Sequence, residues 1–309
     1  MSAGLASGWL HRALPGLSPR ERLERAWRGG WKTLLLEPSP AEEEEARERL
    51  EWIHAIRQGP MDAAAVQAGP TPLFEEEPYL GPGREGPASP AAPARQAALR
   101  DVEAALEQAR RCGCPRILVR PGLLPVPSGW KGDLLRSWED LEEKRALVEE
   151  LRAQGRDQAL DRVCRFLHGL SRRAEGALLC LRNGFDLAGL DRPQDLAALV
   201  EDLGPRRVRI WVDAGAAALR ELAGDGTLGG LLEEAAPWME GLSLGDVRPG
   251  EAGLPPGMGR LDLPLLRDYG KTSGSQRPWI LELGPSFGWE TLAPALDGWG
   301  ASGPGGSPP

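Results

Sequence analysis

The sequence is poor in histidine. Its 309 residues include only His11, His54 and His168. His11 follows the first apolar run, and the other two lie in predicted helices, where a lone histidine is usually packed or solvated. Imidazole is the commonest protein ligand of catalytic transition metals, so this scarcity argues against a histidine-built metal centre.

Cysteine is also scarce, and its four positions form no disulfide framework. The cysteines are Cys112, Cys114, Cys164 and Cys180. This usage predicts reduced thiols in a cytosolic protein. The pair Cys112-Gly-Cys114 could be a redox or metal-binding pair, but it lacks the two-residue spacing and the second pair typical of such sites.

A net positive charge and long apolar runs are missing as well. The formal net charge of −8 argues against a nucleic-acid partner, because phosphate binding requires basic patches. No apolar run reaches the length of a membrane span, and the N-terminus does not resemble a signal peptide. We therefore expect a cytoplasmic protein with no membrane partner. The excess of arginine over lysine, with 40 Gly and 29 Pro, is typical of a GC-rich bacterial genome.

A repeated unit is the main feature that is present: a short apolar run, a turn, and then an amphipathic helix. Eight such runs alternating with helices predict an α/β fold, a (β/α)8 TIM barrel, as a single domain over residues 1–297. A Gly/Pro/Ser-rich tail, 298–309, is expected to be disordered. The predicted strands are Ala3–Ser7, Trp31–Glu37, Asp62–Gln67, Arg116–Arg120, Ala177–Arg182, Val208–Asp213, Glu240–Leu244 and Pro278–Leu283.

Several connections carry recognisable local signals. Capping boxes at Ser18–Glu21 and Ser39–Glu42 predict two helix starts. Separate helices are expected near Ser137–Gln154 and Arg156–Arg173. A further helix should be capped at Asp191.

Two long segments follow predicted strands, Gly69–Pro93 and Pro121–Gly132. We expect them to cover the barrel mouth, with Phe74 or Trp130 near the pocket. A disordered surface loop is the alternative for Gly69–Pro93.

Barrels of this class place their chemistry at the carboxyl ends of their strands. None of the four lysines ends a predicted strand, so Schiff-base chemistry is not expected. The polar residues at or just beyond strand ends are Arg120, Arg182, Asp213, Ser243, Asp246 and Glu282.

The order of short motifs along the chain resembles the xylose isomerase-like superfamily of sugar phosphate isomerases and epimerases, which includes relatives of endonuclease IV. The motifs are Ile117-Leu-Val-Arg120-Pro-Gly122, Leu178-Leu-Cys-Leu-Arg182-Asn183, Ile210-Trp-Val-Asp213-Ala-Gly-Ala216, Leu242-Ser243-Leu-Gly-Asp246, Gly257-Met-Gly259 and Ile280-Leu-Glu282. They extend over nearly the whole barrel, and their order carries the resemblance more than any one of them.

The resemblance implies a divalent metal held by two glutamates, an aspartate and a histidine, with the glutamates as acid and base. This chain keeps Asp213 and Glu282 at matching positions. Arg182 stands in place of the first glutamate, and Ser243 in place of the histidine. Elsewhere, Arg120 and Ala216 also replace histidines, whereas Asn183, Asp246 and the Gly257–Gly259 loop are retained.

Three oxygen ligands, Asp213, Asp246 and Glu282, could still hold Mg²⁺ or Mn²⁺. A guanidinium at Arg182 would oppose that dication, so the expected site has no metal cofactor. Instead, Arg182 is expected to be buried and to form a salt bridge with Asp213 or Glu282.

Two functions remain open. The first is a divergent sugar phosphate isomerase or epimerase that is independent of metal and acts on or binds a small anionic carbohydrate. Its catalytic residues would be Glu282 and Asp213, and its substrate-binding residues would be Arg120, Arg182, Asn183, Asp246 and Trp130. The second is a catalytically inactive pseudoenzyme that binds a ligand or a partner protein.

Overall fold

The computed structural model describes residues 2–37, 42–68, 86–127, 129–130, 132–174, 176–271 and 277–291. The predicted tail, Phe74 and the second capping box lie outside these residues. Among the helices in this part of the chain, none is long and apolar enough to cross a membrane.

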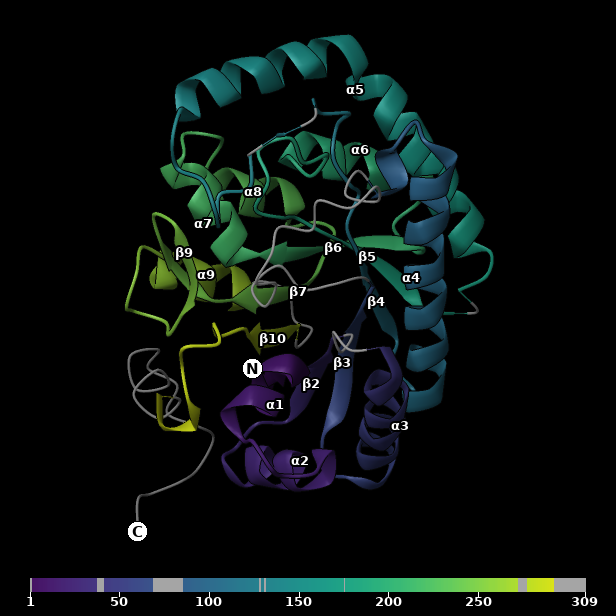
Figure 1. Ribbon diagram of the computed structural model, residues 1–309, viewed down its shortest axis with the longest axis vertical. Helices are drawn as coiled ribbons and strands as arrows, with labels where there is room; N and C mark the ends of the chain where they lie inside the picture. The colour runs from purple at the N-terminus through teal and green to yellow at the C-terminus, as the bar shows by residue number, and fades with distance from the viewer. Residues whose placement is uncertain are drawn as a thin grey trace.

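Eight parallel strands close into a barrel in the order β1-β10-β7-β6-β5-β4-β3-β2, which confirms the (β/α)8 fold (Figure 1). The strands coincide with the predicted apolar runs to within about two residues at either end. They are β1 (Ser2–Ala6), β2 (Thr33–Leu36), β3 (Asp62–Gln67), β4 (Arg116–Val119), β5 (Leu178–Arg182), β6 (Val208–Asp213), β7 (Met239–Leu244) and β10 (Pro278–Leu281).

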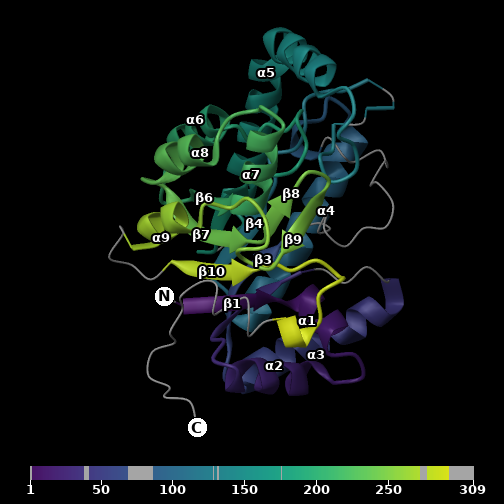
Figure 2. The same ribbon diagram turned by 90° about the vertical axis from the view of Figure 1, so that its left-hand side faces the viewer.

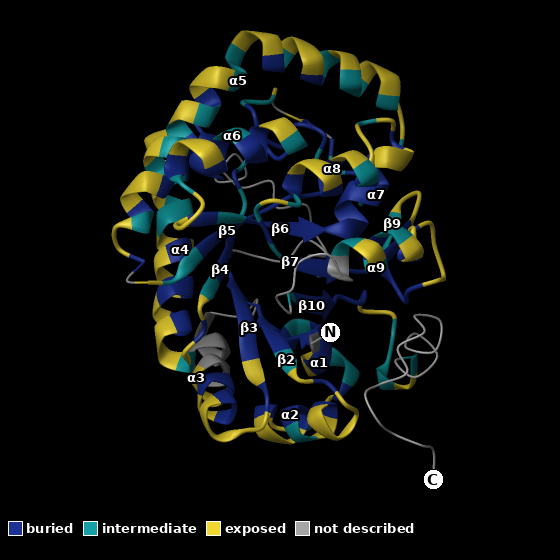
Figure 3. Cartoon of the chain, turned by 180° about the vertical axis from the view of Figure 1, so that it is seen from behind, coloured by how far each residue is buried: buried dark blue, intermediate teal, exposed yellow. Residues whose placement is uncertain are grey.

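Helices surround the barrel and turn their exposed residues outward (Figure 3). They are α1 (Ser7–Ala13), α2 (Pro19–Arg28), α3 (Glu42–Gln58), α4 (Ala92–Cys112), α5 (Leu141–Ser171), α6 (Pro193–Leu203), α7 (Ala214–Leu222), α8 (Leu228–Ala235) and α9 (Leu263–Lys271). The described residues also include two short 3-10 helices, Gly86–Ala88 and Trp289–Thr291. Because helices cover the outer face of the barrel, the strands are buried on both faces and read as continuous apolar runs.

The barrel interior depends on matched side-chain sizes. Trp211 on β6 is fully buried and pairs in register with Gly241 on β7. A Cβ atom at Gly241 would lie 2.2 Å from the indole ring, so only glycine leaves room for Trp211 there.

The first predicted capping box is confirmed at the start of α2. The backbone N–H of Glu21 donates to Ser18 Oγ, and the Glu21 carboxylate accepts from the Ser18 backbone N–H at 2.8 Å. Pro19 occupies the first helical position, where its missing N–H costs nothing.

Two local predictions are wrong. The expected pair of helices between β4 and β5 is one continuous helix, α5, because Gly155 is accommodated in the helix interior. Asp191 does not cap α6, whose N-cap is Arg192 without a side-chain cap. The Asp191 carboxylate instead accepts from Gly184 N and pairs with Arg220, so tertiary partners displace the local one.

A short antiparallel hairpin follows β7 and was not predicted. It consists of β8 (Asp246–Arg248) and β9 (Glu251–Leu254), and it contacts α7 (Figure 2). Its position after β7 places it at the carboxyl end of the barrel.

Candidate functional site

Polar side chains lie at or next to the carboxyl ends of the barrel strands, at one rim that we call the barrel mouth. In strand order from β1 to β10 they are Ser7, Glu37, Gln67, Arg120, Arg182, Asp213, Ser243 and Glu282. Parallel strands bring all of their carboxyl ends to the same rim, so residues distant in sequence converge there.

Arg182 is the central residue of this mouth and is 1% exposed. Its Nη2 donates to Asp213 Oδ2 at 2.6 Å and to Glu282 Oε2 at 2.8 Å. Its Nη1 donates to Gln67 Oε1 at 2.6 Å. The predicted buried salt bridge is therefore confirmed, and it involves both carboxylates rather than one.

The electrostatics of Arg182 explain why a buried cation is tolerated there. Burial acts to lower its pKa, but the charges of Glu282 and Asp213 outweigh burial and raise the pKa of Arg182 above the usual value. The guanidinium thus supplies the positive charge that two buried carboxylates require.

Both carboxylate oxygens of Asp213 accept hydrogen bonds from the protein. Its Oδ1 accepts from Ala216 N at 3.0 Å as the N-cap of α7, and its Oδ2 accepts from Arg182. Asn183 fixes the Asp213 backbone through both amide atoms, at 2.7 Å and 2.9 Å. The Asn183 contacts tie the end of β5 to the end of β6.

Glu282 differs from Asp213 in one respect. Its Oε2 accepts from Arg182, whereas its Oε1 is buried and has no hydrogen-bond partner in the part of the chain that the structure describes. A buried carboxylate oxygen without a donor costs free energy and is available to accept a proton or a hydrogen bond.

Arg120 is the second cation of the mouth. Its Nε and Nη2 are buried and have no partner among the described residues. Burial and the charge of Arg182 lower the pKa of Arg120 to about 10, although Asp213 and Glu282 act in the opposite direction. Arg120 is therefore a cation that its surroundings disfavour, with donor groups available for an anion.

Asp246 organises a loop. Its Oδ1 accepts from the backbone N–H groups of Val247 and Leu261, and its Oδ2 accepts from those of Gly257 and Gly259, at 2.8–2.9 Å. Asp246 is fully buried. Oδ2 thus holds the retained Gly257–Gly259 loop, and Oδ1 holds the residues on either side of it, Val247 and Leu261.

Replacing Asp246 by Ala should destabilise the protein by about 1–3 kcal/mol, because buried N–H groups lose their acceptor. Urea unfolding measures this cost. Asp246→Asn, which keeps one acceptor oxygen, should recover part of it. Equal stability of the wild type and Asp246→Ala would contradict this role.

The expected alternative of Mg²⁺ or Mn²⁺ at Asp213, Asp246 and Glu282 does not fit these contacts. Arg182 donates hydrogen bonds to one oxygen of Asp213 and one oxygen of Glu282, and its positive charge would repel a metal ion there. Backbone N–H groups donate to both oxygens of Asp246. Across the described ranges, no group of three or more His, Cys, Asp or Glu residues could hold a metal ion.

The segment after β4 lies at the mouth end, as expected from its position. Leu123 forms an antiparallel bridge with Gly189 in the loop after β5. Trp130 is buried, and its Nε1 donates to Asp186 Oδ1 at 2.9 Å in that same loop. Contact of Trp130 with a substrate stays a prediction.

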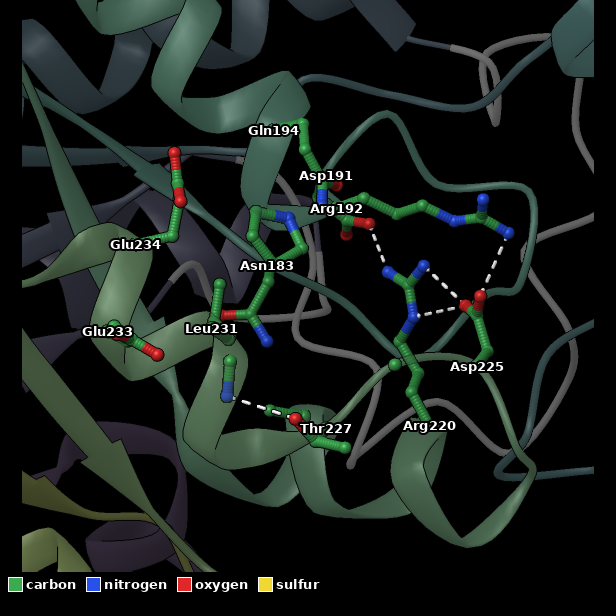
Figure 4. A pocket seen from close by; sticks show the side chains of 14 residues that line it. Asn183, Asp191, Arg192, Gln194, Arg220, Asp225, Thr227, Leu231, Glu233 and Glu234 are labelled. Atoms are coloured by element: carbon green, nitrogen blue, oxygen red, sulfur yellow. Dashed lines mark hydrogen bonds and ion pairs between the residues drawn. The ribbon is translucent and has the colours of Figure 1, made fainter.

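A pocket of about 490 Å³ lies beside the mouth, between α6, α7 and α8 (Figure 4). Asn183 lines it on the barrel side. Its cations are paired: Arg220 binds Asp191 and Asp225, and Arg192 Nη2 lies 2.8 Å from Asp225. This network joins the loop after β5 to α7 and to the connection between α7 and α8.

Sequence reasoning missed three residues of the mouth: Ser7, Glu37 and Gln67. Glu37 Oε2 accepts from Gly8 N, and the Glu37 backbone N–H donates to Ser7 Oγ, both at 3.0 Å. Glu37 and Gln67 are the last residues of their predicted runs, as Arg120 and Arg182 are. Applying the strand-end rule to every run would have found them.

Solved structures with this architecture include sugar epimerases. A D-psicose 3-epimerase with D-tagatose from Clostridium cellulolyticum H10 is 15% identical, with a TM-score of 0.60 over 97% of this chain and 90% of that one. A 3-keto-D-glucoside 4-epimerase from E. coli is 15% identical, with a TM-score of 0.64 over 97% and 99%. This chain has the fold of these sugar epimerases.

The same fold also carries other chemistry. An AP endonuclease of family 2 from Brucella melitensis is 14% identical, with a TM-score of 0.61 over 96% of this chain and 97% of that one. No protein-family model and no curated protein matches the chain. The resemblance to xylose isomerase-like barrels is thus confirmed at the level of the fold, and function rests on the site.

Proposed function

We propose that the barrel mouth binds a small anionic carbohydrate without a metal ion and moves a proton on it, as an isomerase or epimerase does. One observation carries the proposal: Glu282 Oε1 and the Arg120 nitrogens Nε and Nη2 are buried at one mouth without partners among the described residues. An unpaired hydrogen-bond acceptor and an unpaired cation at one mouth suit a ligand that carries both a proton donor and a negative charge.

The roles follow from which atoms are engaged. Glu282 Oε1 acts as the general base that takes a proton from carbon next to a carbonyl. Arg120 binds the phosphate or carboxylate of the substrate. Arg182 holds Asp213 and Glu282 in place and, with its positive charge, favours the negative charge that develops on the substrate oxygen.

Arg120→Met tests the anion site. Sugar phosphates and sugar carboxylates should raise the melting temperature of the wild type, and the increase should saturate with ligand concentration. At a hundredfold excess over Kd, the free energy of unfolding should rise by about 2.7 kcal/mol. Arg120→Met should abolish this increase. The matched neutral sugars should give none with either protein.

The unliganded Arg120→Met variant should be at least as stable as the wild type. A cation whose pKa is lowered to about 10 in the folded state costs stability at every pH below that value, and the cost fades as pH rises toward its unfolded pKa. Arg248→Met, which removes an exposed cation, is the matched control. The anion proposal fails if no compound of the panel shifts the wild type, or if Arg120→Met keeps the shift.

A binding barrel without catalysis is the second candidate. Arg182 favours it, because that residue already engages Asp213 and one oxygen of Glu282. An anion that stabilises the wild type but never exchanges a carbon-bound hydrogen with solvent would favour this candidate over the isomerase.

A further inference from the structure

The open donors of Arg120 lie on one edge of its guanidinium group. In an arginine side chain, the Nε–H and one N–H of Nη2 point in the same direction and form a two-pronged donor, whose spacing matches the two oxygens of a carboxylate. Nε and Nη2 are the two Arg120 nitrogens that are buried without a partner among the described residues. The mouth therefore holds an intact two-pronged donor rather than two separate N–H groups.

Two other arginines show what this edge binds elsewhere in the protein. Nε and Nη2 of Arg220 both donate to Asp225 Oδ2, at 2.8 Å and 2.6 Å. Nε and Nη2 of Arg116 both lie 2.8 Å from Glu240 Oε1. In each pair the chain itself supplies a carboxylate to the edge. No residue of the described ranges supplies one to Arg120, so its edge suits the carboxylate of a ligand.

The charges of the mouth favour an anion with a single negative charge. Arg120 and Arg182 balance Asp213 and Glu282, and Arg182 is already paired with both carboxylates. A carboxylate brings one negative charge, whereas a phosphate ester brings about 1.5 to 2 near neutral pH. Removing an ion from water costs more free energy as its charge rises, and Arg120 alone among these four groups remains to offset that cost.

Backbone N–H groups that could surround a phosphate are engaged by carboxylates of the chain. In barrels of this class, phosphates commonly bind at the loops after the last two strands and at a helix N-terminus. Here four N–H groups around the loop after β7 donate to Asp246. At the N-terminus of α7, Asp213 accepts from a backbone N–H as the N-cap. These two places therefore offer a phosphate few donors.

We propose that the substrate of the mouth is a sugar acid, a polyhydroxylated carboxylate that also carries a carbonyl group. Its carboxylate pairs with the Nε and Nη2 edge of Arg120, which leaves the rest of the molecule to reach Glu282. A phosphate ester on the same carbon skeleton binds this edge more weakly. The inference rests on the proposed function, because it names the substrate class of the same site.

Matched ligands test the choice of anion in thermal shifts of the full-length chain. D-glucuronate is compared with D-glucose 6-phosphate, and D-galacturonate with D-galactose 6-phosphate, with D-glucose and D-galactose as neutral controls. The sugar acid of a pair should bind with a Kd at least about tenfold lower than its phosphate, a difference equal to one charge-assisted hydrogen bond. The neutral sugars should produce no shift.

Arg120→Lys tests the two-pronged contact, because lysine keeps the positive charge but has no planar edge. The Kd of the sugar acid should rise by about tenfold or more in this variant. Arg248→Lys, at an exposed arginine, is the matched control and should leave the Kd unchanged.

The outcomes separate this inference from the function on which it rests. If the phosphates bind as tightly as the sugar acids or more tightly, the inference is overturned and the anion site stands. If Arg120→Lys binds the sugar acid as well as the wild type does, the two-pronged contact is likewise overturned. If no anion of either class shifts the wild type, the proposed function fails and the inference fails with it.

Discussion

Arg182→Met should destabilise the protein by about 3–5 kcal/mol, the usual cost of removing one partner of a buried ion pair. The change leaves Asp213 Oδ2 and Glu282 Oε2 buried without their cation, and it takes the donor from Gln67. Urea unfolding measures the loss. The free energy of unfolding of a protein is only about 5–15 kcal/mol, so this one substitution should remove a large part of it.

Two further variants distinguish the stability lost by leaving buried charges unpaired from the stability lost by removing any arginine side chain. Arg116→Met breaks a partly exposed pair with Glu240 at the opposite end of the barrel, and it should cost only about 1 kcal/mol or less. Combining Arg182→Met with Asp213→Asn and Glu282→Gln should recover stability, because no uncompensated charge remains. An Arg182→Met protein as stable as the wild type would refute the assigned role, as would a triple variant no better than the single one.

Glu282→Gln should lower the rate of solvent hydrogen exchange into a bound anionic sugar by about 10²–10⁴-fold, the usual contribution of a general base. The amide cannot take up the proton, yet it keeps the shape of the side chain. NMR in deuterated solvent measures the exchange, using a compound that raises the melting temperature of the wild type. The thermal shift should survive in Glu282→Gln, because Arg120 still binds the anion.

Glu240→Gln is the matched control, since Glu240 lies at the amino end of β7, away from the mouth. It should leave the exchange rate unchanged. Exchange at the wild-type rate in Glu282→Gln would exclude Glu282 as the base. A wild-type protein that binds anions but exchanges nothing would identify the barrel as a binding protein.

The sequence alone determined the barrel and the convergence of Arg182, Asp213 and Glu282. Strand and helix patterns are local, so β3 and β6 could be read to the residue. Once eight parallel strands are predicted, closure brings their last residues to one rim. The salt bridge of Arg182 then follows from the cost of an unpaired buried charge.

Only the tertiary structure decided which polar atoms are engaged. Arg182 and Gln67 meet across 115 residues of chain, and no local pattern encodes that contact. Asp246 matched a site residue in sequence order, yet four backbone N–H groups hold both of its oxygens. Among the described residues, Glu282 Oε1 and the Arg120 nitrogens Nε and Nη2 have no hydrogen-bond partner. The sequence could not predict this, because hydrogen-bond partners depend on side-chain geometry across strands and not on spacing along the chain.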